Sequence, residues 1–278
     1  MKKKKRNLAV WMGDTFGVIF GILIFVVPFL FMIVNSLKDK KEANLLRITL
    51  PSEFHLENYT EVFKTGNYIL LRAFKNSILI TLGTVLILII ACSMCGYILQ
   101  RRRDKKMNVL NMIILSGLMV PPAILPTIWV LQGLHIYKTL FGLIMVETAL
   151  QIPFTVILYR SYIGTIPVEL EEAGYIDGCS RLQLFRKIIF PLLKPVTATV
   201  TLINAVNVFN DFTNPLYFLP GTKNATVQLT LFNFMGQYAN SYNLLFADVV
   251  IITLPMLLLF FFFNRQIVDG MVAGSVKG

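Results

Sequence analysis

Side chains that could carry out bond chemistry or bind a metal are few and scattered in this chain. Cys92 and Cys95 form a C-x-x-C pair, a spacing typical of redox dithiols and of half a zinc site. The pair falls inside a long apolar run with no second pair nearby, so small buried thiols are the better interpretation. Cys179 stands alone, and neither His55 nor His135 converges with acids in the sequence. The sequence therefore predicts no catalytic residue and no metal site.

Nucleotide-binding chemistry is not indicated either. The Walker A pattern G-x-x-x-x-G-K-[ST], which cradles phosphate, occurs nowhere in the chain. We therefore expect no enzymatic activity and no cofactor in this chain. If ATP powers its function, another subunit must bind the nucleotide.

The composition is that of an integral membrane protein. Of 278 residues, 55% are hydrophobic and only 15% are charged, and the mean hydropathy is +0.66. The pI near 9.6 could suggest a nucleic-acid partner. However, the basic residues sit in short clusters beside apolar runs, without a basic groove or interleaved aromatic residues, so no nucleic acid is expected.

Hydropathy predicts six membrane spans, each near the length that crosses the hydrocarbon core. They are placed at 15–36, 77–99, 108–132, 139–160, 192–212 and 244–263. Basic residues concentrate at Lys2–Arg6, Arg101–Lys106 and Arg160–Lys194, which the positive-inside rule assigns to the cytoplasm. Both termini are therefore expected to be cytoplasmic.

These spans divide the chain into a tail at 1–14, a first span, an extracytoplasmic segment at 37–76, a core of five spans at 77–263 and a tail at 264–278. The basic start followed by an apolar run could also be a signal peptide. The run is longer than a signal core and lacks a convincing cleavage site, so an uncleaved first span is expected.

Proline interrupts several predicted spans and indicates irregular helices. The third span contains Pro121, Pro122 and Pro126, the fourth Pro153 and the sixth Pro255. Each proline removes one backbone hydrogen bond, which a membrane protein tolerates where neighbouring helices or a cavity satisfy the freed carbonyl. Kinks without functional meaning remain an alternative for each.

The most polar stretch of the predicted cytoplasmic side is the loop 165–190. Pro167 suits the first turn of a helix, and Glu169, Glu171 and Glu172 complement the positive end of the helix dipole. Gly178 can supply the left-handed residue that ends the helix. A short acidic helix is therefore predicted to end at Gly178.

A second helix is predicted directly after the first. Ser180 followed by Gln183 forms a capping box, and the residues after it alternate between apolar and basic at helical spacing. Gly174 and Gly178 lie four residues apart, so the first helix presents one face without side-chain bulk. By pattern alone, the pair also fits an amphipathic helix at the membrane surface.

The fifth predicted span has a polar face. Thr197, Thr201, Asn204, Asn207 and Asp211 fall within about a third of a helix circumference at ~3.6 residues per turn. Such a face cannot point at lipid and suits either a hydrophilic path or hydrogen bonds between helices.

Further polar residues occur in the fourth and sixth predicted spans. Glu147 and Gln151 lie one helical turn apart in the fourth span, and Asp248 begins the sixth. The candidate translocation path comprises Glu147, Gln151, Thr201, Asn204, Asn207 and Asp211.

The loop at 165–190 resembles the EAA motif of permease subunits of ATP-binding-cassette (ABC) importers. The matching positions are Glu172-Ala173-Gly174, then Gly178 after three residues, Ile188 after nine more, and Pro191. Four further stretches look like carbohydrate permeases of the maltose-transporter type: LENYTEVF at 56–63, KNS at 75–77, FNDFTNPL at 209–216 and the terminal GMVAGSVKG. The resemblance therefore covers nearly the whole chain.

The resemblance implies the smaller permease subunit of a type I importer in the bacterial cell membrane. Its fold would be six transmembrane helices with a cytoplasmic coupling helix between the fourth and the fifth. Its partners would be a second, non-identical permease, two cytoplasmic ATPases that bind ATP and Mg, and an extracellular protein that delivers a sugar or oligosaccharide. Transport would proceed by alternating access.

The resemblance also assigns the loop, here called the coupling loop, to ATPase docking. The carried-over positions are Glu171, Glu172, Ala173, Gly174, Asp177, Gly178, Arg181, Ile188 and Pro191. The chain departs from the motif at Gly174, where a second Ala is usual, and at Phe190, where Leu is usual before the proline. Both departures bear on helix packing.

Three alternatives remain open at this level. An ABC permease for amino acids, peptides or polyols would share the loop. A secondary transporter would carry coupling acids deep in its spans together with inverted repeats, and no convincing repeat is found. A membrane-embedded enzyme would need a cluster of His or acids at one depth.

Neutral Asn, Thr and Gln favour a hydroxyl-rich solute over a charged one.

Overall fold

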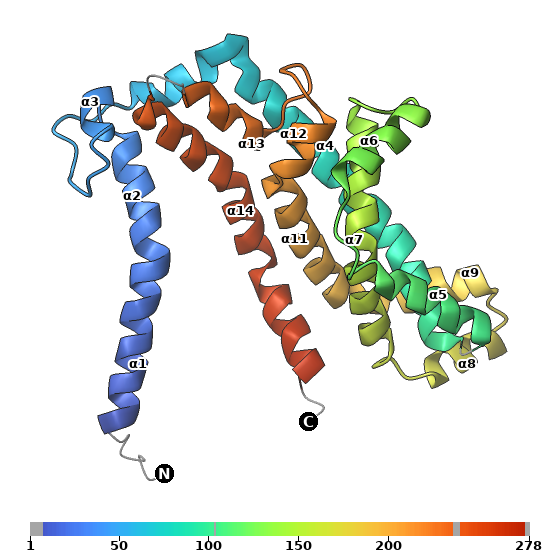
Figure 1. Ribbon diagram of the computed structural model, residues 1–278. Helices are drawn as coiled ribbons and strands as arrows, with labels where there is room; N and C mark the ends of the chain where they lie inside the picture. Colours follow the sequence, from blue (N-terminus) through green and yellow to red (C-terminus); the bar gives the residue numbers. More distant parts are fainter. Residues whose placement is uncertain (1–7, 103, 236–239, 276–278) are drawn as a thin grey trace. The chain divides into compact units, whose positions relative to one another are not determined.

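The computed structural model describes residues 8–102, 104–235 and 240–275, and the regular elements in these ranges are helices (Figure 1). The predicted all-α class is therefore confirmed. In chain order the elements are α1 Leu8–Gly21, η1 Ile22–Val26, α2 Val27–Ser36, α3 Lys40–Ala43, α4 Glu57–Arg101, α5 Lys105–Ser116, α6 Ile124–Gly133, α7 Leu140–Ile163, α8 Glu169–Ile176, α9 Arg181–Leu184, η2 Phe185–Ile189, α10 Phe190–Leu192, α11 Lys194–Asn210, α12 Thr213–Phe218, α13 Val227–Thr230, η3 Leu231–Phe234 and α14 Tyr242–Ser275.

Four helical stretches of the described residues are long and apolar enough to cross a membrane. They are Gly13–Ser36, Glu57–Arg101, Leu140–Ile163 and Tyr242–Phe262. A fifth is formed if Arg181–Leu192 and Lys194–Asn210, which meet at a bend of 73°, count as one broken span. The predicted fifth span, 192–212, thus corresponds mainly to α11.

The third predicted span, 108–132, is not one helix, which corrects the sequence-based expectation. Helix α5 ends at Ser116 and α6 begins only at Ile124. Pro121 and Pro122 lie in the non-helical stretch between them, where their rings fix φ and remove two backbone donors. By contrast, Pro153 and Pro255 lie inside helices that continue past them.

Several helices extend beyond the predicted boundaries. Helix α1 begins at Leu8, within the predicted tail, and α14 continues to Ser275 through most of the tail predicted at 264–278. Helix α4 begins at Glu57, well ahead of the predicted start at 77. It is interrupted at Thr65–Tyr68, where three consecutive residues have positive φ values of 58°, 56° and 60°.

The chain forms two compact units, and residues 1–70 with 230–254 make up the first. In this unit Lys38 is fully buried and its Nζ donates to the carbonyl of Arg47 at 2.8 Å. Asn58 donates to the Lys38 carbonyl at 2.9 Å and accepts from the side-chain amide of Asn243 at 2.8 Å. Asp248, also fully buried, accepts from the Thr230 hydroxyl at 2.9 Å.

The second unit, residues 71–229 and 255–278, contains the candidate functional residues. One apolar core joins the end of α4 and the end of α7 to the coupling loop: Leu99, Tyr159, Ile163, Leu184 and Ile189 are all buried in it. Helix α11 packs along α7 (Figure 1), where Asn204 donates to the Thr155 hydroxyl at 3.2 Å. The coupling loop is therefore packed onto the ends of two spans.

Candidate functional site

The coupling loop contains the two helices that the sequence predicts. Helix α8 carries Glu169, Glu171 and Glu172 in its first turn, and Gly178 follows it with φ of +79°. The left-handed terminating residue is thus confirmed. The helix starts at Glu169, so Pro167 precedes the first turn instead of occupying it.

The second helix begins with the predicted capping box. The Ser180 backbone N–H donates to Gln183 Oε1 at 2.8 Å, and the Gln183 N–H donates to Ser180 Oγ at 3.4 Å. Helix α9 then runs into the π-helical turn η2 and on to Pro191 in α10. The two helices are therefore separate elements joined by a tight turn.

Gly174 permits close packing between these two helices. A β-carbon at this position would lie 2.6 Å from Ile188 Cδ1 and 3.0 Å from Leu184 Cδ1. Both contacts are shorter than van der Waals distance, so a residue with a β-carbon would require the ends of the Ile188 and Leu184 side chains to move. Glycine in place of the usual Ala at this motif position therefore leaves room for the Ile188 side chain.

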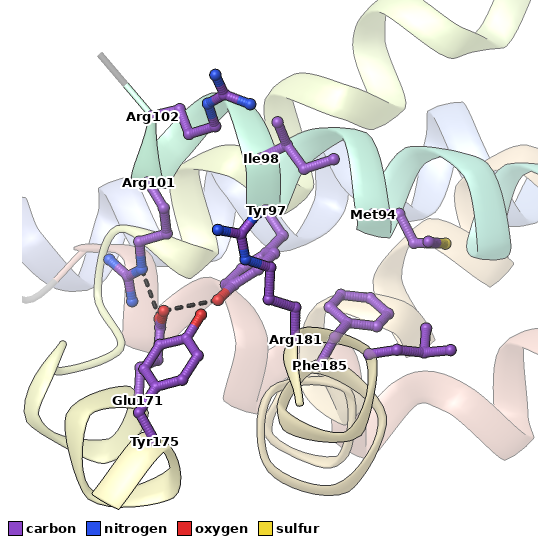
Figure 2. A pocket seen from close by; sticks show the side chains of 10 residues that line it. Met94, Tyr97, Ile98, Arg101, Arg102, Glu171, Tyr175, Arg181 and Phe185 are labelled. Atoms are coloured by element: carbon purple, nitrogen blue, oxygen red, sulfur yellow. Dashed lines mark hydrogen bonds and ion pairs between the residues drawn. The ribbon is translucent and has the colours of Figure 1, made fainter. Parts of the chain in front are cut away.

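Glu171 faces away from the open side of the loop and binds the end of α4 (Figure 2). Its carboxylate accepts from the Tyr97 hydroxyl at 2.7 Å and from Arg101 Nε at 2.6 Å. Arg101 also donates to the carbonyl of Ile166, at the entry to the loop, at 2.9 Å. The side chains of Arg101 and Glu171 are only 17% and 7% exposed. This cluster fixes α8 to the second predicted span.

Sequence analysis missed the roles of Tyr97 and Arg101. In the sequence, Arg101 serves only as one of the basic residues that indicate the cytoplasmic side. The one sign of its pairing with Glu171 is that the acidic helix is predicted on the same side of the membrane. Glu171 was predicted to take part in ATPase docking, whereas the structure directs its carboxylate inward to α4.

The outward side of α8 is acidic and apolar. Glu172, Ala173, Asp177 and Gly178 are exposed, and Ile176, at the end of the helix, is 87% exposed. Of the other predicted positions, Arg181 and Pro191 are exposed, Ile188 is half-buried and Gly174 is buried. This surface suits contact with a partner that offers an apolar groove with basic edges.

The polar face of α11 is divided between interhelical bonds and open positions. Asn204 is fully buried and donates to the carbonyl of Val200 and to Thr155 in α7. Thr201 is half-buried and Asn207 is exposed. Asn204 thus takes the packing role that the sequence left as an alternative, which corrects its placement on an open path.

Glu147 and Asp211 converge through Asn214. Glu147 is buried and accepts from the Asn214 side-chain amide at 3.0 Å. Asp211 accepts from the backbone N–H groups of Thr213 and Asn214 at 2.9 and 3.2 Å. Helix α11 has already ended at Asn210, so Asp211 lies between it and α12, which begins at Thr213. Gln151 is half-buried one turn further along α7.

A second charged pair lies where α4 ends and α5 begins. Asp104 accepts from the Met107 N–H at 3.0 Å, which lowers the pKa of its carboxyl and keeps it ionised. The same carboxylate accepts from Arg102 at 2.8 Å. Among the described residues, no group of three or more His, Cys, Asp or Glu is placed to hold a metal ion.

Residues 89–272 match the family described as binding-protein-dependent transport system inner membrane component. Three curated proteins are similar over nearly their full lengths. The chain is 32% identical to a probable starch degradation products transport system permease protein, AmyC, of Thermoanaerobacterium thermosulfurigenes, covering 99% of each. It is 33% identical to the melibiose/raffinose/stachyose import permease protein MelC of Bacillus subtilis, covering 91% of each. It is 31% identical to the multiple sugar-binding transport system permease protein MsmG of Streptococcus mutans, covering 100% of each.

Solved structures agree with the fold. A chain of a bacterial ABC transporter involved in import of the acidic polysaccharide alginate superposes with a TM-score of 0.82 at 21% identity, covering 95% of this chain and 99% of that one. A chain of the MetNI methionine ABC transporter gives a TM-score of 0.54 at 16% identity, covering 73% and 96%. The shared fold is thus found with solutes of different chemistry.

Proposed function

The chain belongs to the family of binding-protein-dependent transport system inner membrane components, and we propose that it is a permease subunit through which an ATP-driven importer moves a sugar or oligosaccharide. The coupling loop carries this proposal. Its outward face offers an acidic and apolar contact surface, while Glu171 ties the same helix to α4. A partner that moves α8 would therefore move a membrane span.

The proposed partner on this surface is a separate cytoplasmic ATPase. Ile176 and the acidic side chains of Glu172 and Asp177 would enter its groove, and Gly178 would allow close approach because it has no side chain. ATP and Mg would be bound by a pair of such ATPases, since the chain has no Walker A sequence. Both chain termini would lie on this cytoplasmic side.

The proposed substrate is a neutral, hydroxyl-rich solute. The full-length relatives are named for starch degradation products, for melibiose, raffinose and stachyose, and for multiple sugars. On α11 the exposed Asn207 and half-buried Thr201 offer neutral hydrogen-bonding groups. We propose that they line the path together with a second, non-identical permease, and that an extracellular binding protein delivers the solute.

Reconstitution tests this function. The chain would be placed in proteoliposomes with the second permease, the ATPase pair and the binding protein, and labelled oligosaccharide uptake would be measured. We expect ATP-dependent uptake that is lost when any one subunit is omitted. Uptake of amino acids but not of sugars would contradict the proposed substrate class. ATP hydrolysis by the purified chain alone would contradict the proposal that separate subunits bind and hydrolyse ATP.

A further inference from the structure

The coupling loop and the end of α4 line an open pocket of about 740 Å³ (Figure 2). It is lined by Met94 and Ile98 of α4, by Leu182 of α9 and by Phe185 of η2. Its walls are therefore largely apolar, although it lies beside arginine side chains. We call this space the α4–α9 pocket.

The α4–α9 pocket holds one uncompensated cation. Arg101 is paired with Glu171 at 2.6 Å, and Arg102 with Asp104 at 2.8 Å. Arg181, an exposed residue that the resemblance also assigns to ATPase docking, lines the pocket as well, and within the described part of the chain its guanidinium has no hydrogen bond or ion pair. Figure 2 shows the Arg181 side chain extending from the start of α9 toward the α4 side chains. One monovalent anion would balance the pocket.

An apolar strip of α4 leads directly to this cation. Ile90, Met94 and Ile98, spaced four residues apart, are 54%, 39% and 41% exposed. Residues at this spacing form one inclined row on a helix surface. Because Met94 and Ile98 also line the pocket, the row and the pocket form one surface, apolar along the span and cationic at its end.

We propose that the α4–α9 pocket binds an anionic phospholipid, with its phosphate at Arg181 and an acyl chain along Ile90, Met94 and Ile98. A soluble phosphate would use the cation but leave the apolar row without a partner. A zwitterionic lipid would use the row but would add its own cation beside Arg181. An anionic amphiphile matches both features. Assignment to the cytoplasmic leaflet rests on the proposed function.

The position of the pocket suggests a consequence for the coupling loop. Leu182 and Phe185 belong to the same helical segment as Leu184 and Ile188, which Gly174 allows α8 to approach. A lipid bound between this segment and α4 would stabilise the contact between the coupling loop and the span. Membrane composition would thereby tune transport.

The test uses the photo-cross-linking residue p-benzoylphenylalanine in place of Leu182 in the assembled importer. The importer is placed in nanodiscs containing equal amounts of phosphatidylglycerol and phosphatidylcholine, and adducts are identified by mass spectrometry. We expect phosphatidylglycerol adducts to exceed phosphatidylcholine adducts about fivefold, the ratio that one arginine at a lipid headgroup confers. The ratio is read within one sample and does not depend on transport activity, so it is separate from the proposed function.

Matched variants assign the preference to Arg181. Arg181→Gln should bring the adduct ratio to about one, and Arg181→Lys should keep it above one. Arg186→Gln, at an exposed arginine of the same segment outside the pocket lining, should leave the ratio unchanged. Equal labelling of both lipids by the parent, adducts only with another protein subunit, or complete competition by dissolved glycerol phosphate would each overturn the proposal.

Discussion

The guanidinium of Arg101, the last residue of α4, donates to the carboxylate of Glu171 in α8 at 2.6 Å, although the two residues are 70 positions apart. The pair is largely buried, and Tyr97 shares the same carboxylate. Rotation of α8 relative to α4 would therefore break a desolvated ion pair. We therefore expect this contact to make α8 and the span move together.

Removing the negative charge should weaken this connection. In Glu171→Gln the Tyr97 hydroxyl can still donate to an amide oxygen, but Arg101 is left buried without its counter-ion. We expect a loss of about 3 kcal/mol in the packing of the loop, as for one-sided removal of buried pairs. Sugar uptake should fall more than ATPase activity in the reconstituted importer. Glu169→Gln, at an exposed position of the same turn, is the charge-matched control, and equal behaviour of the two variants would contradict this role.

Substitutions at Gly178 can distinguish the effect of backbone strain from the effect of a bulky side chain. Its φ of +79° is unfavourable for a residue with a β-carbon, whereas a β-carbon would meet no neighbouring atom. Gly178→Ala should therefore cost about 1–2 kcal/mol, and Gly178→Asn less, which thermal unfolding of the purified complex would measure. Gly178→Arg should also abolish uptake by blocking the ATPase contact. Equal uptake by the Ala and Arg variants would show that bulk at this position has no effect.

The effect of a substitution at Gly174 on stability should depend on the size of the residue at position 188. Gly174→Ala improves helix propensity by about 1 kcal/mol but places a β-carbon 2.6 Å from Ile188 Cδ1, an overpacking that costs about 1–3 kcal/mol. We expect net destabilisation of the single variant and recovery when Ile188→Val removes that methyl group. A double-mutant cycle on thermal unfolding would measure this, and strictly additive effects would contradict the contact.

The two asparagines of α11 should differ in accessibility. Asn207 is exposed and Asn204 is buried against Thr155. In a background without the native cysteines, Asn207→Cys should react with a water-soluble thiol reagent, and saturating substrate should slow the reaction. Asn204→Cys should be protected, since its position is inside the α7–α11 contact. Fast labelling at position 204 would show that the packing opens during transport.

Much of the coupling loop's local structure could be predicted from short sequence patterns. The capping box at Ser180 and the left-handed Gly178 depend on residues within a few positions, so the sequence contains the information that defines them. The same holds for the break at Pro121 and Pro122, where hydropathy predicts one span at 108–132 and the structure has two helices.

Long-range contacts could not be predicted in the same way. Helical periodicity places Asn204 on a polar face but does not say whether that face meets water or Thr155. Likewise, nothing local distinguishes Glu171, which turns toward α4, from Glu172, which stays exposed. Partner choice among equivalent polar groups is decided by the packing of distant helices.

Cross-linking from Ile176 tests the central claim most directly, because its side chain is 87% exposed at the end of α8. The photo-cross-linker p-benzoylphenylalanine would replace Ile176 in the importer assembled in membranes, with Leu134, an exposed residue on the predicted external side, as the control. We predict a covalent adduct with the ATPase subunit from position 176 and none from position 134. Adducts from position 176 that contain only lipid or the extracellular binding protein would contradict the assignment of α8 as the coupling helix.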